Sequence, residues 1–136
     1  NYLGWDAPTE AVLAGAGRLG SALLGYPGFR DQGFKILAAF DVSPKRRSLI
    51  SGIPVYPASQ ITETVRRLKV VLGILTVPAD QAQSVADALV AGGVRGIWNF
   101  TPVQIAVPPE VIIKREDLAA SLAVLSHRLR RGDKGR

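Results

Sequence analysis

Three glycines near the start of the chain have the spacing of a phosphate-binding loop. They occupy the first, third and sixth positions of the segment GAGRLG, residues 15–20, between an apolar run and a stretch with helical character. In a turn from a strand into a helix, the first glycine permits the tight turn, the second lets the backbone approach a pyrophosphate, and the third lets helix and strand pack closely. The first N–H groups of the helix then face the anion. The segment therefore predicts a pyrophosphate site.

An acid further along the chain indicates which nucleotide this loop would hold. Asp41 ends the apolar run 34–40 and stands at the offset of about 20 residues at which a carboxylate can bond the adenosine ribose. Such a carboxylate repels a 2′-phosphate and so favours NAD over NADP. The cations at 45–47 argue the other way, because basic side chains just past this strand can hold a 2′-phosphate. An ordinary helix cap or turn residue is the alternative role for Asp41.

The elements that must position these residues alternate between strands and helices along the chain. We expect strands at 10–14, 34–40, 70–77, 96–100 and 111–114, with an edge strand at 53–57 because its prolines exclude a central position. We expect helices at 18–25 (ended by Pro27 and Gly28), 59–68 (capped by Ser59), 80–91 and 117–131, and a short helix or turn at 43–50. Such alternation predicts an α/β fold with a doubly wound, mostly parallel sheet.

Composition argues against several kinds of site. The 136 residues suffice for one domain. The absence of cysteine excludes disulfides, thiolate metal sites and a cysteine nucleophile. A single histidine, His127, argues against a histidine metal site or a Ser-His-Asp triad. No apolar run reaches the eighteen or so residues of a membrane span. We expect a cytoplasmic protein with no metal and no membrane partner.

The formal charge of +6 is concentrated near the end of the chain. Five of the last nine residues are basic: Arg128, Arg130, Arg131, Lys134 and Arg136. Basic residues suit the negative end of a helix dipole, and a basic domain also attracts polyanions. We interpret the tail first as a solvated helix end and second as a nucleic-acid contact.

From about Ala11 to Leu129 the chain resembles the nucleotide-binding domain of the Rex family of redox-sensing transcriptional repressors. The matching segments are GAGRLGSALLGYPGF, AAFDVSPKR, LTVPADQAQSVADALVAGGVRGIWNFTP, VPPEV and EDLAASLAVLSHRL. The resemblance implies a Rossmann-like domain that binds NADH or NAD, a homodimer completed by a swapped C-terminal helix, and an N-terminal winged helix that binds operator DNA. NADH binding would close the dimer and release the DNA.

The resemblance also divides the chain and places its site. It implies a lead-in or linker at 1–8, an NAD(H)-binding domain at 9–116, and a dimerisation helix with a basic tail at 117–136. The chain has no winged-helix segment and no methionine, so we expect the sensor half of such a repressor, or a stand-alone relative. The expected cofactor residues are Gly15, Ala16, Gly17, Arg18, Leu19, Gly20, Asp41, Val42, Thr76, Val77, Pro78, Ala79, Asn99, Phe100, Thr101 and Pro102.

Two further residues and two departures come from the same resemblance. Tyr26 resembles the family tyrosine near the nicotinamide, and Asp117 resembles the acid that reaches it from the partner subunit. Leu118, also an expected cofactor contact, stands where the family often has an aromatic residue, which bears on nicotinamide packing. Ser43 stands where a second acid is frequent, which weakens the exclusion of NADP.

Three functions compete at this stage. A redox sensor binds a cofactor, changes shape and performs no reaction, so it needs no catalytic residue. A CoA-binding domain like that of acyl-CoA synthetases shares the fold, but it has less use for Asp41 because the CoA ribose carries a 3′-phosphate. A small NAD-dependent dehydrogenase needs a substrate domain and a proton donor, and neither is evident. The leucines of the last helix, Leu118, Leu122, Leu125 and Leu129, form one face that could pack on its own sheet or on a partner.

Overall fold

One seven-stranded sheet organises the protein. The computed structural model describes residues 7–42, 49–116 and 127–130. Across the sheet the strands run in the order β3-β4-β2-β1-β5-β6-β7. Their bounds are β1 Thr9–Ala14, β2 Phe34–Asp41, β3 Leu49–Ile50, β4 Ile53–Pro57, β5 Leu72–Leu75, β6 Gly96–Asn99 and β7 Ile112–Arg115. Every neighbouring pair is parallel except β3 and β4. The predicted doubly wound, mostly parallel sheet is confirmed.

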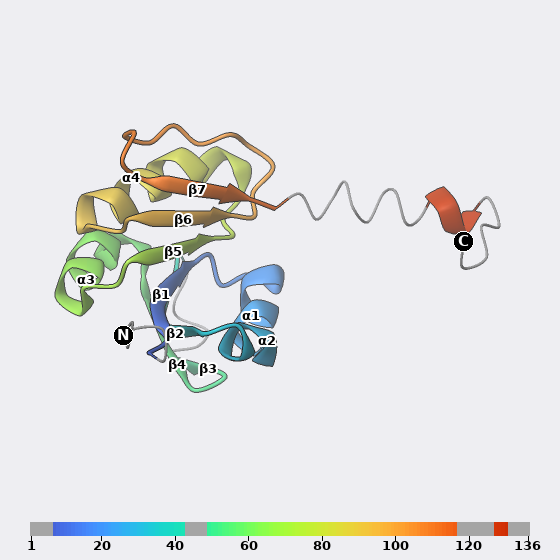
Figure 1. The fold of residues 1–136 in the computed structure, drawn as a ribbon, viewed down its shortest axis with the longest axis horizontal. Helices are drawn as coiled ribbons and strands as arrows, with labels where there is room; N and C mark the ends of the chain where they lie inside the picture. The colour runs from blue at the N-terminus through green and yellow to red at the C-terminus, as the bar shows by residue number, and fades with distance from the viewer. Residues whose placement is uncertain (1–6, 43–48, 117–126, 131–136) are drawn as a thin grey trace.

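Helices cover both faces of this sheet (Figure 1). The helices α1 (Arg18–Leu24) and α2 (Pro27–Asp31) lie on one face, and α3 (Ile61–Leu68) and α4 (Ala82–Gly92) on the other. Short 3₁₀ turns, η3 (Ala58–Gln60) and η4 (Ala79–Gln81), lead into α3 and α4. Because every crossover returns to the same end of the sheet, the loops after β1, β2, β4, β5 and β6 all emerge at one edge.

The alternation of side chains along β1 explains why the strand is apolar throughout. Ala11 and Leu13 belong to a buried cluster with the α1–α2 face, whereas Val12 and Ala14 belong to a second cluster with α3 and α4. Successive residues of a strand point to opposite faces, and here both faces are covered by helices. A strand buried on both sides therefore reads as a continuous apolar run rather than an alternating one.

The helix predicted at 18–25 is confirmed as α1, with Gly25 as its C-cap, but two inferences drawn from prolines are wrong. Pro27 does not end the helical region but is the first residue of α2, with Tyr26 as its N-cap. Proline fits that position because the N–H that it lacks would have no helical partner anyway. Strand β4 is not at the edge either, because β3 pairs with its outer side. That strand has only two residues, so β4 needs few ladder hydrogen bonds there, and its prolines are tolerated.

Other expectations near β4 are corrected or lie outside the described residues. Ser59 caps no helix: it lies within η3, and α3 begins at Ile61 with no side-chain hydrogen bond at its N-cap. Of the short helix or turn expected at 43–50, Leu49 and Ile50 are strand β3, and 43–48 lie outside the described residues. Of the helix expected at 117–131, only 127–130 are described, and these four are helical.

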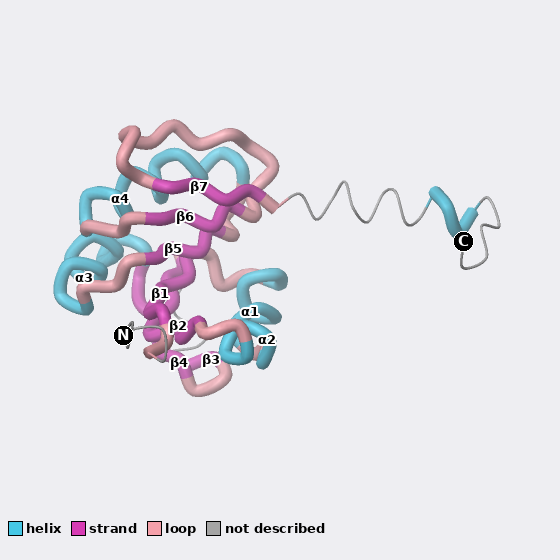
Figure 2. The backbone as a smooth tube through the Cα atoms, in the orientation of Figure 1, coloured by secondary structure: helices cyan, strands magenta, loops and turns pink. Residues whose placement is uncertain are grey.

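A long loop joins β6 to β7 and runs beside α4 (Figure 2). The side-chain amide of Gln83, in α4, holds it: Nε2 donates to the Ala106 carbonyl at 2.8 Å, and Oε1 accepts the Ala106 N–H at 2.9 Å. Arg115 at the end of β7 donates to the Pro102 carbonyl at 3.1 Å. The loop after β6, which belongs to the ligand-binding edge of the fold, is therefore held at several points.

Candidate nucleotide-binding site

The first glycine of the loop is required by backbone geometry and by lack of space. Gly15 follows β1 directly and has a φ of +102°, a region that side chains rarely allow. Its N–H donates to the Phe40 carbonyl at 2.8 Å. A Cβ at this position would lie 2.8 Å from the backbone carbonyl carbon of Thr76. The turn out of β1 is thus pressed against the end of β5, and only glycine fits.

The other two glycines differ from each other in what surrounds them. A Cβ on Gly20 would collide with the carbonyl group of Gly15, so this glycine lets α1 pack close to the loop. A Cβ on Gly17 would meet nothing within 4 Å, and Gly17 is the N-cap of α1 with no side-chain cap. Gly15 and Gly20 therefore serve packing, whereas Gly17 leaves open space beside the first turn of α1. This is the division of roles that the sequence predicts for a pyrophosphate loop.

Thr76 ties the glycine loop to the neighbouring strand. Its hydroxyl lies 2.6 Å from the Gly15 carbonyl oxygen and 3.0 Å from that of Ala14. Its backbone N–H also donates to the Ala14 carbonyl at 2.9 Å. The side chain that the sequence places beside the cofactor is therefore already used to hold the loop that would bind it.

A cavity of about 390 Å³ opens between this loop and the α3–α4 face. The walls are mainly apolar, and Asp41 at the end of β2 contributes a carboxylate. A mostly apolar cleft with few polar groups is typical of a small-molecule site. The lining residues are Ala14, Gly15, Gly17, Phe40, Asp41, Val42, Ala58, Ile61, Thr76, Val77, Pro78, Gln81 and Val85.

Several of these lining residues are absent from the set expected from the sequence. Phe40, Ala58, Ile61, Gln81 and Val85 line the cavity, and three of them lie in or next to the turns η3 and η4. The sequence could have indicated the residues of these turns by their position, because η3 directly follows β4 and η4 comes after β5, and both strands end at this edge of the sheet. Ala16, Arg18 and Ala79 of the expected set do not line the cavity, although each lies next to a residue that does. The expected residues Leu19, Gly20, Tyr26, Asn99, Phe100, Thr101 and Pro102 lie outside the cavity lining.

The loop after β6 presents backbone and one ring rather than polar side chains. Asn99 is fully buried: its Nδ2 donates to the Val103 carbonyl at 2.8 Å, and its Oδ1 accepts from the Thr101 N–H at 2.9 Å and the Thr101 hydroxyl at 2.7 Å. Both polar atoms of the Asn99 amide are thus bonded within the loop. Phe100, between these two buried residues, is half-buried. Asn99 and Thr101 therefore shape the loop, and Phe100 is the ring that remains partly accessible.

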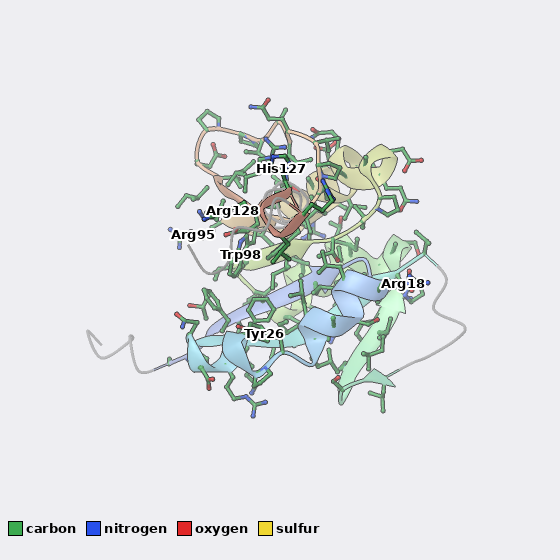
Figure 3. All side chains as sticks on the ribbon, turned by 90° about the vertical axis from the view of Figure 1, so that its right-hand side faces the viewer. Arg18, Tyr26, Arg95, Trp98, His127 and Arg128 are labelled. Carbon is green, nitrogen blue, oxygen red and sulfur yellow. The ribbon has the colours of Figure 1, made fainter. Side chains whose placement is uncertain are left out.

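Aromatic rings connect this loop to α2 (Figure 3). The ring of Trp98 lies 5.3 Å from that of Phe100 and 5.6 Å from that of Phe29, centroid to centroid. Phe29 in turn lies 5.6 Å from Tyr26, whose side chain is 56% exposed. The expected nicotinamide neighbours Tyr26 and Phe100 are therefore linked through two packed rings, although they lie far apart in the sequence.

Some expected features fall outside this site. Asp117 and Leu118 lie outside the described residues, and so do Leu122 and Leu125 of the last helix, whereas Leu129 is 65% exposed. His127 is exposed. Within residues 7–42, 49–116 and 127–130, no three side chains of His, Cys, Asp or Glu are grouped so as to hold a metal ion. The same residues include no helix with the length and apolar character needed to cross a bilayer.

The fold and this edge define a doubly wound α/β domain with a dinucleotide-type glycine loop. A sequence model of the CoA binding domain family matches residues 6–103. The chain belongs to the CoA binding domain family.

Individual curated relatives indicate a more specific likeness than the family match. The redox-sensing transcriptional repressor Rex of Treponema denticola is 44% identical over 126 residues, which cover 91% of this chain and 60% of that protein. The Rex protein of Porphyromonas gingivalis is 44% identical over 131 residues, covering 96% and 60% respectively. The chain therefore spans about 60% of the length of these relatives.

A solved structure agrees with the sequence comparison. The crystal structure of RSP, a Rex-family repressor, superposes with a TM-score of 0.84 at 36% identity, covering 97% of this chain and 64% of that one. RSP has also been crystallised with β-NADH, and with β-NAD⁺ and operator DNA. The resemblance to Rex stated from the sequence is confirmed.

Proposed function

We propose that this chain is the NADH-sensing domain of a redox-responsive transcriptional repressor. The observation that carries the proposal is the open space at Gly17, beside a cavity that has Asp41 in its wall. The relatives support it, because Rex proteins are named as redox-sensing repressors and RSP takes both NADH and NAD⁺. The cofactor of this domain is therefore NAD(H).

Each part of the cofactor has a place along the sheet edge. The pyrophosphate lies against the backbone at Gly17 and the first turn of α1. The adenosine enters the cavity, where Ile61 and Val85 enclose the base and the Asp41 carboxylate accepts hydrogen bonds from the ribose. The nicotinamide half then extends the opposite way, past the end of β5 toward Phe100 and Tyr26.

The domain acts by binding and catalyses no reaction. It works in the cytoplasm as a homodimer, with Asp117 and Leu118 of one subunit near Tyr26 of the other. A winged-helix domain upstream of this chain holds the operator DNA. A ligand shifts such an equilibrium only through its different affinity for the two states. Contacts made across the interface in one state alone supply that difference.

Titration calorimetry of the full chain with NADH, NAD⁺, NADPH and CoA tests this proposal. We expect NADH to bind, and CoA to bind at least tenfold more weakly, because Asp41 repels the 3′-phosphate of the CoA ribose. The variant Gly17→Val should lose NADH binding while the protein remains folded, since its Cβ meets open space. Tighter binding of CoA than of NADH would instead support the CoA-binding alternative, for which the family match is the favouring observation.

A further inference from the structure

Trp98 lies at the centre of a cluster of aromatic rings. Its ring lies 5.3 Å from Phe100, 5.6 Å from Phe29 and 5.7 Å from Phe34. These partners come from the loop after β6, from α2 and from β2, which are three separate parts of the fold. A change in the orientation of the Trp98 indole would therefore alter the packing of all three partner rings.

One hydrogen bond sets the orientation of that indole. Its Nε1–H donates to Oε2 of Glu116 at 3.3 Å. Glu116 is itself held in place, because its backbone N–H donates to the Asn99 carbonyl at 2.9 Å, next to Trp98 in β6. An indole N–H among packed rings is unfavourable unless it has an acceptor. The Glu116 carboxylate is the acceptor that the structure provides.

Lys114 contacts the same carboxylate but adds little. Its Nζ lies 3.8 Å from Oε2 of Glu116, and its side chain is 71% exposed. Exposed ion pairs of this length contribute weakly to stability. Glu116 therefore makes two different interactions: a hydrogen bond that orients the Trp98 ring and an ion pair with Lys114 on the surface. Substitutions of Trp98 and Lys114 distinguish the two.

We propose that Glu116, acting through Trp98, is a positioning residue for the wall that receives the nicotinamide. This inference rests on the proposed function. With the pyrophosphate at Gly17 and the adenosine in the cavity, the nicotinamide half must run across the carboxyl ends of β5 and β6. Neighbouring strands of a sheet lie about 5 Å apart. Phe100 follows β6 directly, at the end of that path, and its ring packs on Trp98. Trp98 in turn connects through Phe29 to Tyr26.

ADP-ribose provides the test, because it contains every part of the cofactor except the nicotinamide. Calorimetry on the full chain compares NADH with ADP-ribose for Trp98→Phe, Glu116→Ala and Glu116→Gln. We expect Trp98→Phe and Glu116→Ala to weaken NADH binding severalfold, because the ring that packs on Phe100 loses its fixed orientation, and to leave ADP-ribose affinity at the wild-type level. Glu116→Gln keeps an acceptor oxygen and should restore most of the NADH affinity.

Matched controls separate positioning from general damage. Lys114→Gln removes the charge of the surface pair but keeps most of the stem that lines a pocket beside Trp98. Glu110→Ala removes a carboxylate from the exposed loop before β7. Neither variant should change the ratio of NADH to ADP-ribose affinity. Equal losses for both ligands, or no loss for either, would overturn the positioning role. A wild-type chain that binds neither ligand would overturn the proposed function, and this inference with it. Bound ADP-ribose also shows that a variant is folded around the glycine loop.

Discussion

The hydroxyl of Thr76 lies 2.6 Å from the carbonyl oxygen of Gly15, so the end of β5 holds the turn that leaves β1. The two residues are 61 positions apart in the chain, and the contact joins neighbouring parallel strands at their carboxyl ends. The glycine loop is thus held in shape before any ligand arrives. Preorganisation of this kind reduces the entropy that binding must remove.

Replacing Thr76 by valine should weaken both the fold and the site. The change keeps the shape of the side chain but removes the hydroxyl, and we expect a loss of about 1 kcal/mol in the free energy of unfolding. NADH affinity should also fall severalfold because the loop loosens. Thr62→Val is the matched control, since it removes a similar hydrogen bond, to the Ala88 carbonyl at 2.9 Å, which joins α3 to α4. Equal loss of NADH affinity in both variants would contradict the role given to Thr76.

Gly20→Ala should destabilise the protein strongly. The new methyl group would collide with the Gly15 carbonyl, and we expect a loss of about 3 kcal/mol, as for an overpacked core. Gly17→Ala is the control, because its Cβ meets open space and its φ of −76° suits any residue. Urea unfolding of the two variants measures the difference. If Gly20→Ala were as stable as Gly17→Ala, the close packing of α1 against the Gly15 carbonyl would be contradicted.

Asp41→Asn should change which dinucleotide binds. Loss of a hydrogen bond to a charged group should weaken NADH about tenfold or more. The repulsion of a 2′-phosphate disappears at the same time, so the ratio of NADPH to NADH affinity should rise. Asp80→Asn makes the same chemical change at an exposed acid in η4 that does not line the cavity, and it should leave the ratio unaltered. An unchanged ratio in Asp41→Asn would remove the ribose role of Asp41.

Deleting residues 117–136 should separate the two subunits. We expect the shortened chain to sediment as a monomer and to bind NADH more weakly than the full chain, because the proposed dimer uses Asp117 and Leu118 in the partner's site. ADP-ribose affinity should change less, since the loop at 15–20 and Asp41 remain. A full chain that sediments as a monomer both with and without NADH would contradict the cross-subunit arrangement.

The sequence predicts the parts of this site that follow from strand order and glycine chemistry. The three loop glycines, Asp41 and residues 76–78 all lie at the expected edge, because parallel strands place their carboxyl ends together. The apolar runs give the central strands within a few residues. What the sequence shows here is the periodicity and the turn chemistry of single segments.

The sequence was misleading where a partner elsewhere in the chain decides a residue's role. Asn99 has the polar side chain expected of a ligand contact, but Thr101 and Val103 use both ends of its amide. Pro54 signals an edge strand, yet β3 pairs beside it with only two residues. The link from Trp98 to Glu116 spans 18 positions and depends on the pairing of β6 with β7. Such contacts follow from the assembled sheet and have no local sequence signal.

A crystal structure of the full chain grown with NADH tests the central claim most directly. We predict density for the cofactor with its pyrophosphate against the backbone at Gly17, both adenosine ribose hydroxyls within hydrogen-bonding distance of Asp41, and the nicotinamide ring beside Phe100. Density for NADH elsewhere, or a cavity lined by Ile61 and Val85 that stays empty at saturating NADH, would contradict the account.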